Sequence, residues 1–262
     1  MDIVFNQPYL TQEEKQIIGL VIDHSSFCGD GKYTRKSESF IEKKHKIKNC
    51  LLTNSCTSAL EISAILSKVN IGDEIIMPSY TFVSTANAFI LRGAKPVFVD
   101  IKKETMNIDE NLIENKITEK TKCIVVVHYA GFSCDMGIVE NIAKKYNLML
   151  IEDAAQAISA KYKKKFLGSI GDLATFSFHQ TKNIHCGEGG ALLINKSKYL
   201  KRSKIIREKG TNRKDFMEGK INKYEWVDLG SSYLPSELQA AFLFSQLNKL
   251  DEVISSRLNI WE

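Results

Sequence analysis

The stretch CIVVVHYAGFSCDMGIVENIAKKYNLMLIED, residues 123–153, decides the fold. It opens with a β-branched apolar run, residues 123–127, that predicts a strand. Residues 138–146 predict a helix, and the apolar run at 148–151 predicts a second strand. Apolar strands separated by a helix indicate a parallel sheet that is buried on both faces.

The same alternation continues on both sides of this stretch. Further strands are predicted at residues 49–53, 74–77, 96–100, 174–178 and 191–194. Further helices are predicted at 11–22, where residues 11–14 have capping-box spacing, and at 37–45, 59–66, 81–91, 200–208 and, unbroken, from 235 to about 261. The last two strands have no long helix between them, so we expect them to pair antiparallel. The pattern predicts an α/β fold with a mostly parallel, seven-stranded type of sheet and helices on both faces.

The composition excludes several classes of protein. The 262 residues include 44% hydrophobic and 26% charged residues, which excludes a disordered chain. No apolar run approaches the ~20 residues of a membrane span, and the first residues lack a secretory signal pattern. A net charge of +5 is a weak signal for nucleic acid, and the six cysteines form no CxxC motif, so no metal site is expected. We therefore expect a cytoplasmic protein that binds neither nucleic acid nor membrane.

Polar residues follow three of the predicted strands, where open α/β sheets bind ligands. The segment 54–58 (NSCTS) opens a helix with small hydroxyl residues, which suits an anion. Asp153 follows a buried strand, and Lys182 follows another strand together with Ser177. Each feature alone has an ordinary interpretation, namely a helix N-cap for segment 54–58 and for Asp153, and a solvent-exposed lysine for Lys182.

Together these groups match the needs of pyridoxal phosphate. Its phosphate favours a helix N-terminus, its pyridine nitrogen favours a carboxylate, and its aldehyde reacts with a lysine. Phe82, after another strand end, offers a flat face for the ring, although core packing is the alternative.

Six motifs then identify a family. They are NSCTSAL (54–60), PSYTFVST (78–85), HYAG (128–131), EDAAQ (152–156), SFHQTKN (177–183) and GEGG (187–190). In this order they resemble the DegT/DnrJ/EryC family of sugar aminotransferases, which are pyridoxal phosphate enzymes of fold type I with an aspartate aminotransferase-like large domain. The resemblance covers essentially the whole chain.

The resemblance implies a role for each matching residue. Lys182 is the catalytic lysine that forms the Schiff base and moves a proton, and Asp153 is the partner of the pyridinium nitrogen. The other cofactor-binding residues that it implies are Cys56, Thr57 and Ser177 at the phosphate, Phe82 on the ring face, and Gln156 at the ring or its oxygen.

The resemblance also implies a homodimer whose active sites are shared. The loop 230–233 corresponds to the segment that reaches the phosphate of the neighbouring subunit. Ser232 stands where many relatives have asparagine, and it retains one hydroxyl that can donate a hydrogen bond.

Within the family, the resemblance is closest to the branch that makes dTDP-4-amino-4,6-dideoxy-D-galactose from dTDP-4-keto-6-deoxy-D-glucose. It implies a nucleotide-linked 4-keto-6-deoxyhexose as substrate, L-glutamate as amino donor, and a product for surface polysaccharides such as lipopolysaccharide or enterobacterial common antigen. The alternatives are an aminotransferase for a different nucleotide keto-sugar and a truncated, inactive fragment that only binds cofactor or a partner.

We expect three segments in the chain. Residues 1–48 form an N-terminal helical segment, residues 49–234 the cofactor-binding large domain, and residues 235–262 the start of a long connecting helix. Family members continue into a C-terminal small domain, which is expected to be absent here.

The sequence leaves two interpretations open for each of three features. His128 either fills the core or touches substrate or cofactor, and the loop with Gly29 and Gly31 either turns or approaches the nucleotide. The basic residues Arg207, Lys209 and Arg213 either bind diphosphate or form a solvated face.

Overall fold

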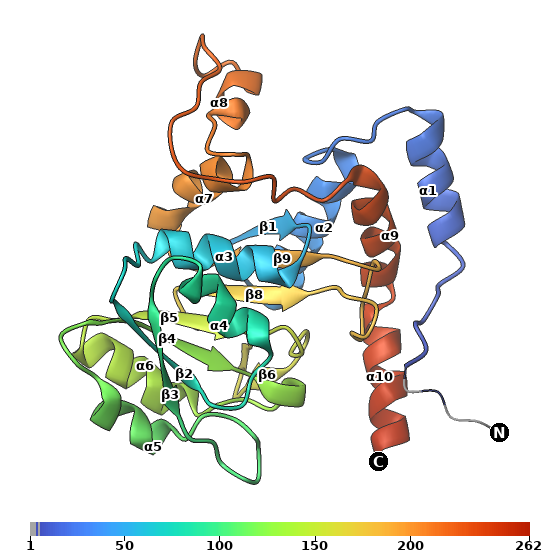
Figure 1. The fold of residues 1–262 in the computed structure, drawn as a ribbon. Helices are drawn as coiled ribbons and strands as arrows, with labels where there is room; N and C mark the ends of the chain where they lie inside the picture. The colour runs from blue at the N-terminus through green and yellow to red at the C-terminus, as the bar shows by residue number, and fades with distance from the viewer. Residues whose placement is uncertain (1–3, 5) are drawn as a thin grey trace.

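The structure, a computed structural model, describes residue 4 and residues 6–262. Its centre is a seven-stranded sheet in the order β1-β9-β8-β5-β4-β2-β3 (Figure 1). The strands are β1 (Asn49–Thr53), β2 (Glu74–Pro78), β3 (Lys95–Val99), β4 (Thr121–Val127), β5 (Met149–Asp153), β8 (Leu173–Ser177) and β9 (Gly190–Ile194). All seven predicted strands are confirmed, with ends that differ by no more than two residues.

The pairing of the strands is mostly parallel, as predicted. β3, β2, β4, β5 and β8 pair parallel in succession, whereas β9 runs antiparallel to both β8 and β1. The expected antiparallel pair is therefore confirmed. Since β9 is reversed between β1 and β8, β1 points in the same direction as the parallel strands.

Helices cover both faces of the sheet, as predicted (Figure 1). One face packs against α3 (Cys56–Leu66), α4 (Val83–Ile90) and α7 (Leu200–Arg207). The other face packs against α2 (Lys32–His45) and α9 (Glu237–Asn248) at one end, and against α5 (Glu110–Ile113) and α6 (Met136–Lys145) at the other. Burial of alternate residues of each strand on opposite faces supplies the main stabilisation of the sheet.

The remaining elements lie around this core. They are α1 (Glu14–Asp23), α8 (Arg213–Met217), α10 (Leu250–Trp261), the short hairpin β6 (Lys161–Tyr162) and β7 (Lys165–Phe166), and the 3₁₀ turns η1 (Glu114–Lys116), η2 (Tyr129–Gly131) and η3 (Ser197–Tyr199). Within the described residues, no helix has the length and apolar character needed to cross a membrane.

The prediction of one unbroken helix over residues 235–261 is wrong. Lys249 leaves helical geometry, with φ −103° and ψ 9°, and separates α9 from α10. Leu250 and Val253 nevertheless continue the buried apolar stripe of α9, because both pack into the same core cluster. The periodicity of the sequence therefore predicted the buried face correctly but did not indicate the break at Lys249.

α2 begins five residues before the predicted start at residue 37. The helix begins at Lys32 because Glu237, at the start of α9, accepts hydrogen bonds from the backbone N–H groups of Tyr33 (2.7 Å) and Thr34 (3.0 Å). This carboxylate supplies the N-terminal cap from a distant part of the chain.

The glycines before α2 are required by close packing inside the chain. A Cβ atom on Gly29 would lie 2.2 Å from the carbonyl oxygen of Pro235, and one on Gly31 would lie 2.5 Å from the side chain of Glu237. The close approach that these glycines permit is therefore to the start of α9.

Arg207 does not belong to a solvated basic face and is not available to a diphosphate. Its side chain is 1% exposed and forms ion pairs with Glu38 (2.7 Å) and Asp30 (3.2 Å). It also donates to the carbonyl oxygen of Leu52 in β1 (3.2 Å). Burial alone would lower the pKa of Arg207, but the two carboxylates outweigh that effect and raise it.

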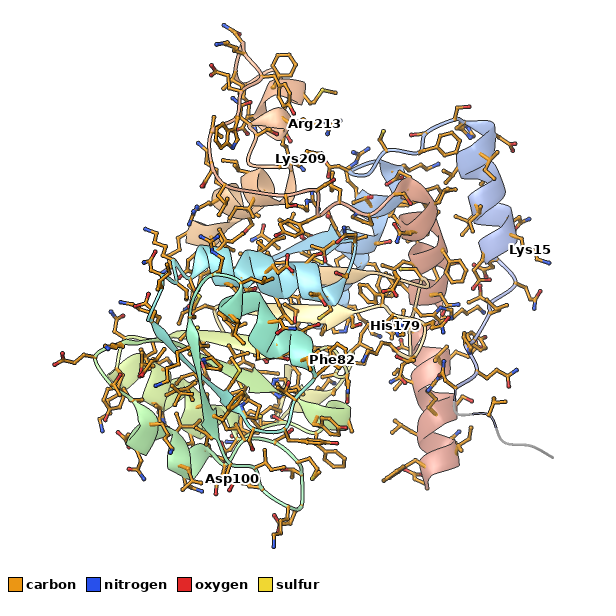
Figure 2. All side chains as sticks on the ribbon, viewed as in Figure 1. Lys15, Phe82, Asp100, His179, Lys209 and Arg213 are labelled. Atoms are coloured by element: carbon orange, nitrogen blue, oxygen red, sulfur yellow. The ribbon has the colours of Figure 1, made fainter. Side chains whose placement is uncertain are left out.

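Lys209 and Arg213 lie in the segment that follows α7 and extends, with α8, away from the sheet (Figure 2). Lys209 is exposed, and Arg213 pairs at 3.4 Å with Glu208. The surroundings of these two residues therefore agree with a solvated surface.

Candidate active site

One edge of the sheet gathers the candidate site residues. β1, β2, β5 and β8 run in the same direction, so their carboxyl ends meet at this edge. Asp153 ends β5, Ser177 ends β8, and Phe82 caps α4 shortly after β2. Figure 2 shows Phe82 and His179, which follows β8, at this same edge. The sheet topology thus assembles residues that lie far apart in the sequence.

Asp153 is a buried carboxylate held by two hydrogen bonds. Its side chain accepts from the Thr85 hydroxyl (2.6 Å) and from the backbone N–H of Ala155 (3.2 Å), and the residue is 4% exposed. Burial raises the pKa of Asp153, and the Thr85 hydroxyl, the Ala155 N–H and the Lys182 ammonium offset this only in part. A cation placed against this carboxylate would therefore be stabilised.

Lys182 lies in a pocket of about 400 Å³ beside that carboxylate. The pocket is lined by Asn6, Ala130, Ala155, Gln156, Ile158, Ser177, Thr181, Lys182, Asn183 and Arg257. The loop is anchored by backbone hydrogen bonds from Lys182 to His179 (2.9 Å) and from Gln180 to Gly187 (2.8 Å). Among the described residues the amine forms no hydrogen bond or ion pair, and its charge acts on the nearby Asp153 carboxylate.

The N-terminus of α3 forms the third part of the site. Ser55 caps the helix by accepting from the N–H of Ser58 (3.0 Å), and Cys56 and Thr57 form the first turn. Burial, together with the nearby Asp153 carboxylate, raises the pKa of the Cys56 thiol, which therefore stays protonated. The first-turn N–H groups and the helix dipole favour an anion here.

Gly190, at the start of β9, supports this turn by close contact. A Cβ atom at Gly190 would lie 2.3 Å from the backbone nitrogen of Cys56. Only glycine leaves enough space for the strand and the helix N-terminus to touch. The last glycine of the GEGG motif thus serves the packing of β9 against the start of α3.

Of two further predicted residues, Gln156 lies in the pocket lining and Ser232 lies outside it. The Gln156 amide oxygen accepts from the N–H of Ala130 (2.6 Å), and Gln156 lines the pocket. Ser232 is exposed and lies outside the pocket lining; its carbonyl oxygen accepts from the Asn54 amide (3.1 Å), just before α3.

His128 is a core residue rather than a pocket residue. It is fully buried; its Nε2 lies 3.0 Å from a Glu152 oxygen, and its Nδ1 accepts from the N–H of Cys134 (3.4 Å). Glu152 also accepts from backbone N–H groups of the loop 168–171. The satisfied-core interpretation holds for His128, whose nitrogens are both engaged.

Sequence reasoning missed Thr85, Thr175 and the tyrosines at positions 80 and 129. Thr85 lies one helical turn after Thr81, whose hydroxyl it meets at 2.8 Å, so the i,i+4 spacing in PSYTFVST was an available signal. Thr175 is paired with Asp153 across β8 and β5, and its buried hydroxyl interacts with the Cys56 thiol, which partly offsets the effect of burial on the pKa of that thiol. No group of three or more His, Cys, Asp or Glu side chains in the described part of the chain could hold a metal ion.

A lysine, a buried carboxylate and a helix N-terminus at one edge of a mostly parallel sheet are the features of an α/β protein that binds an anionic cofactor. The sequence matches the DegT/DnrJ/EryC1/StrS aminotransferase family over residues 8–262. The chain belongs to this family.

The chain is similar to several known proteins. It is 40% identical over 250 residues to the protein MJ1066 of Methanocaldococcus jannaschii, covering 94% of this chain and 64% of the relative. It is 34% identical over 255 residues to the GDP-perosamine synthase of Escherichia coli O157:H7, covering 97% and 68%. Among solved structures, the putative sugar aminotransferase Spr1654 of Streptococcus pneumoniae in its PLP-form matches with a TM-score of 0.87 and 27% identity, covering 96% of this chain and 67% of that chain. The chain thus spans about two thirds of the length of these relatives.

Proposed function

We propose that the chain carries the cofactor-binding large domain of a pyridoxal phosphate-dependent aminotransferase. Lys182 and the buried Asp153 carboxylate at the same strand ends are the observation that carries this proposal. One further observation fits the cofactor: Phe82 is 71% exposed, although it is a large apolar ring. The relative Spr1654 has been solved in both a PLP-form and a PMP-form.

The residues divide the binding of this cofactor among them. Asp153 would face the ring nitrogen, Phe82 the ring face, and Gln156 the ring or its oxygen. The phosphate would be held by Cys56, Thr57 and Ser177. Bound pyridoxal phosphate supplies an aldehyde that condenses with amines and a conjugated ring that accepts electrons.

The chain's own groups supply the acid–base and positioning work. In this proposal the Lys182 amine would take a proton from the substrate carbon and return it to the cofactor carbon. Asp153, held by Thr85, keeps a negative charge where the ring nitrogen would carry a proton. The backbone hydrogen bonds of the 179–187 loop fix the position of the amine.

As substrate we propose a nucleotide-linked 4-keto-6-deoxyhexose, dTDP-4-keto-6-deoxy-D-glucose, aminated to dTDP-4-amino-4,6-dideoxy-D-galactose with L-glutamate as donor. The family membership supports a sugar substrate. The similarity to a GDP-perosamine synthase favours a second candidate, a GDP-linked keto-sugar.

We further propose that two copies of the chain assemble, with Ser232 directed to the cofactor of the neighbouring copy. Exposed apolar side chains on and just after α4, namely Val83, Ile90 and Leu91, support a contact surface. In the same proposal the chain has three segments. The N-terminal helical segment is residues 1–48, the large domain is residues 49–234, and the connection to a small domain is residues 235–262.

Incubation of the chain with pyridoxal phosphate and L-glutamate tests the proposal. We expect formation of 2-oxoglutarate and pyridoxamine phosphate, and then amination of the dTDP-linked keto-sugar in preference to the GDP-linked one, both followed by mass spectrometry. Cofactor binding without any 2-oxoglutarate would instead favour a fragment that only binds cofactor.

Asp153→Asn is expected to raise the stability of the cofactor-free chain and to lower its affinity for the cofactor. Because the folded-state pKa of Asp153 is raised, its contribution to stability is present at low pH and is lost as the pH rises through that pKa. Asparagine carries no charge at any of these pH values, so the variant does not have to bury a carboxylate. The cofactor-free variant should therefore be more stable than the parent chain near neutral pH. Its affinity for pyridoxal phosphate should fall at least about tenfold, since a charge-assisted hydrogen bond is lost.

Denaturant unfolding across pH and titration with pyridoxal phosphate measure the two effects. Asp100→Asn is the matched control, because Asp100 follows β3 at an exposed position. The explanation is wrong if Asp153→Asn lowers stability at neutral pH, or if both variants keep the same cofactor affinity.

A further inference from the structure

Two tyrosines from different strand ends form a hydrogen-bonded pair at this edge of the sheet. The hydroxyl oxygens of Tyr80 and Tyr129 lie 2.9 Å apart, and the ring centroids lie 4.8 Å apart with an interplanar angle of 53°. Tyr80 is 40% exposed and Tyr129 is half-buried. The pair is therefore ordered by mutual contact while its polar side remains open to solvent.

Tyr80 belongs to the turn that carries the cofactor-facing residues. Between it and Phe82, Thr81 meets the hydroxyl of Thr85 at 2.8 Å, and Thr85 donates to Asp153. The two aromatic residues on either side of Thr81 are both exposed. The turn thus presents aromatic rings outward while its hydroxyl-bearing side supports the buried carboxylate.

Tyr129 is fixed next to the wall of the Lys182 pocket. Its backbone N–H donates to the Asn107 side chain (2.9 Å), and the amide of this buried asparagine donates to the carbonyl of Phe132 (2.9 Å). The next residue, Ala130, lines the pocket and has a left-handed φ of 51°. Strain of this kind persists where surrounding bonds hold it, and it is concentrated at binding sites.

The chemistry of the pair suits neutral hydroxyl groups. One phenolic proton is used between the two oxygens, which leaves one O–H to donate and lone pairs to accept. The hydrogen bond between the two hydroxyl groups and partial burial raise the pKa of Tyr129, so this phenol stays uncharged at neutral pH. An uncharged donor–acceptor pair beside apolar rings matches a sugar ring better than it matches the two carboxylates of an amino donor.

We propose that Tyr80 and Tyr129 together bind hydroxyl groups of the sugar ring and so contribute to substrate specificity. This inference rests on the proposed function, because it assigns the pair to the second, sugar substrate of that reaction. It predicts that the phenolic oxygens contribute to binding of the sugar and not to binding of the nucleotide or reaction with the amino donor.

The test uses Tyr80→Phe and Tyr129→Phe, which remove one oxygen and keep the ring. Tyr146→Phe is the matched control, because the Tyr146 hydroxyl bonds to Glu114 (2.8 Å) on the surface near the end of α6. Calorimetry on the pyridoxamine phosphate-loaded chain would compare dTDP alone with dTDP-linked and GDP-linked 6-deoxyhexoses. Thermal unfolding of each variant checks that the fold is unchanged.

We expect each tyrosine variant to weaken binding of the sugar nucleotide about five- to tenfold, with dTDP binding, glutamate-driven conversion of the cofactor and thermal stability unchanged. The double variant should lose less than the product of the single effects, because the two oxygens act as one unit. The control variant should match the parent chain in every measurement.

The assignment is overturned if the variants weaken dTDP and the sugar nucleotide equally, if they weaken neither, or if the parent chain does not distinguish the two ligands. The parent chain could bind the sugar nucleotide more tightly than dTDP, lose this difference in the tyrosine variants, and still not react with glutamate. That result would support the sugar site and refute the aminotransferase proposal. The two ideas can therefore fail separately.

Discussion

Replacing Lys182 with alanine is expected to abolish covalent capture of pyridoxal phosphate and to lower transamination at least about 10³-fold. Of the described residues that line the pocket, Lys182 is the one lysine, and its ammonium acts on the buried Asp153 carboxylate. Its removal takes away both the nucleophile and the proton carrier. The fold should be unaffected, because the side chain of Lys182 bonds to no described residue.

Borohydride reduction followed by peptide mass spectrometry measures the capture. In the parent chain we expect one pyridoxyl group on the peptide that contains Lys182, and none in the alanine variant. Lys182→Arg separates charge from reactivity, because arginine keeps the positive charge beside Asp153 but does not condense with the aldehyde. Lys201→Ala, on the exposed side of α7, is the control and should keep the label.

Two results would contradict this assignment. One is a pyridoxyl group on another lysine of the parent chain, and the other is an arginine variant that retains the parent's transamination rate. Loss of cofactor binding in Lys182→Ala together with a loss of stability would point to a structural role for the loop instead.

The sequence predicted the sheet and the main chemical groups because these depend on local patterns. Apolar runs of β-branched residues form strands that are buried on both faces, and polar residues directly after them lie at strand ends. Asp153 and Lys182 were found in this way, and the structure brings both to one edge.

The features that the sequence did not reveal depend on contacts between distant parts of the chain. Glu237 caps α2 from more than 200 residues away, and Tyr80 meets Tyr129 only because β2 and β4 are neighbours. The hairpin of β6 and β7 has strands of two residues, which are too short for any periodic pattern. Arg207 looked like part of a basic surface because its local sequence contains other cations, whereas its partners lie in α2 and in the preceding loop.

Arg207→Met is expected to lower the free energy of unfolding by about 3–5 kcal/mol. Methionine keeps an unbranched apolar stem but leaves the Glu38 carboxylate without its cation, whereas Asp30 retains a pair with Lys214 (3.5 Å). Glu38 is buried and also accepts from the backbone N–H of Leu52 in β1 (2.9 Å), so it cannot turn toward solvent without breaking a second bond. The large cost arises from this uncompensated buried charge more than from the lost attraction itself.

The position of Arg207 links this stability to the candidate site. Its carbonyl oxygen accepts from the N–H of Tyr233, and Tyr233 in turn accepts from the N–H of Asn54, just before α3. Loosening the ion-pair network should therefore also disturb the helix N-terminus that is proposed to hold the phosphate. We expect the affinity for pyridoxal phosphate to fall in parallel with the stability.

Urea unfolding and cofactor titration of the same samples test both effects. Lys44→Met is the control, because the Asp251 partner of Lys44 is 77% exposed, so the loss of this pair should cost less than about 1 kcal/mol. Adding Glu38→Gln to Arg207→Met should recover part of the stability, since it removes the buried carboxylate that has lost its cation. Equal losses in Arg207→Met and Lys44→Met, or no recovery in the double variant, would show that the buried Glu38 carboxylate does not set the cost.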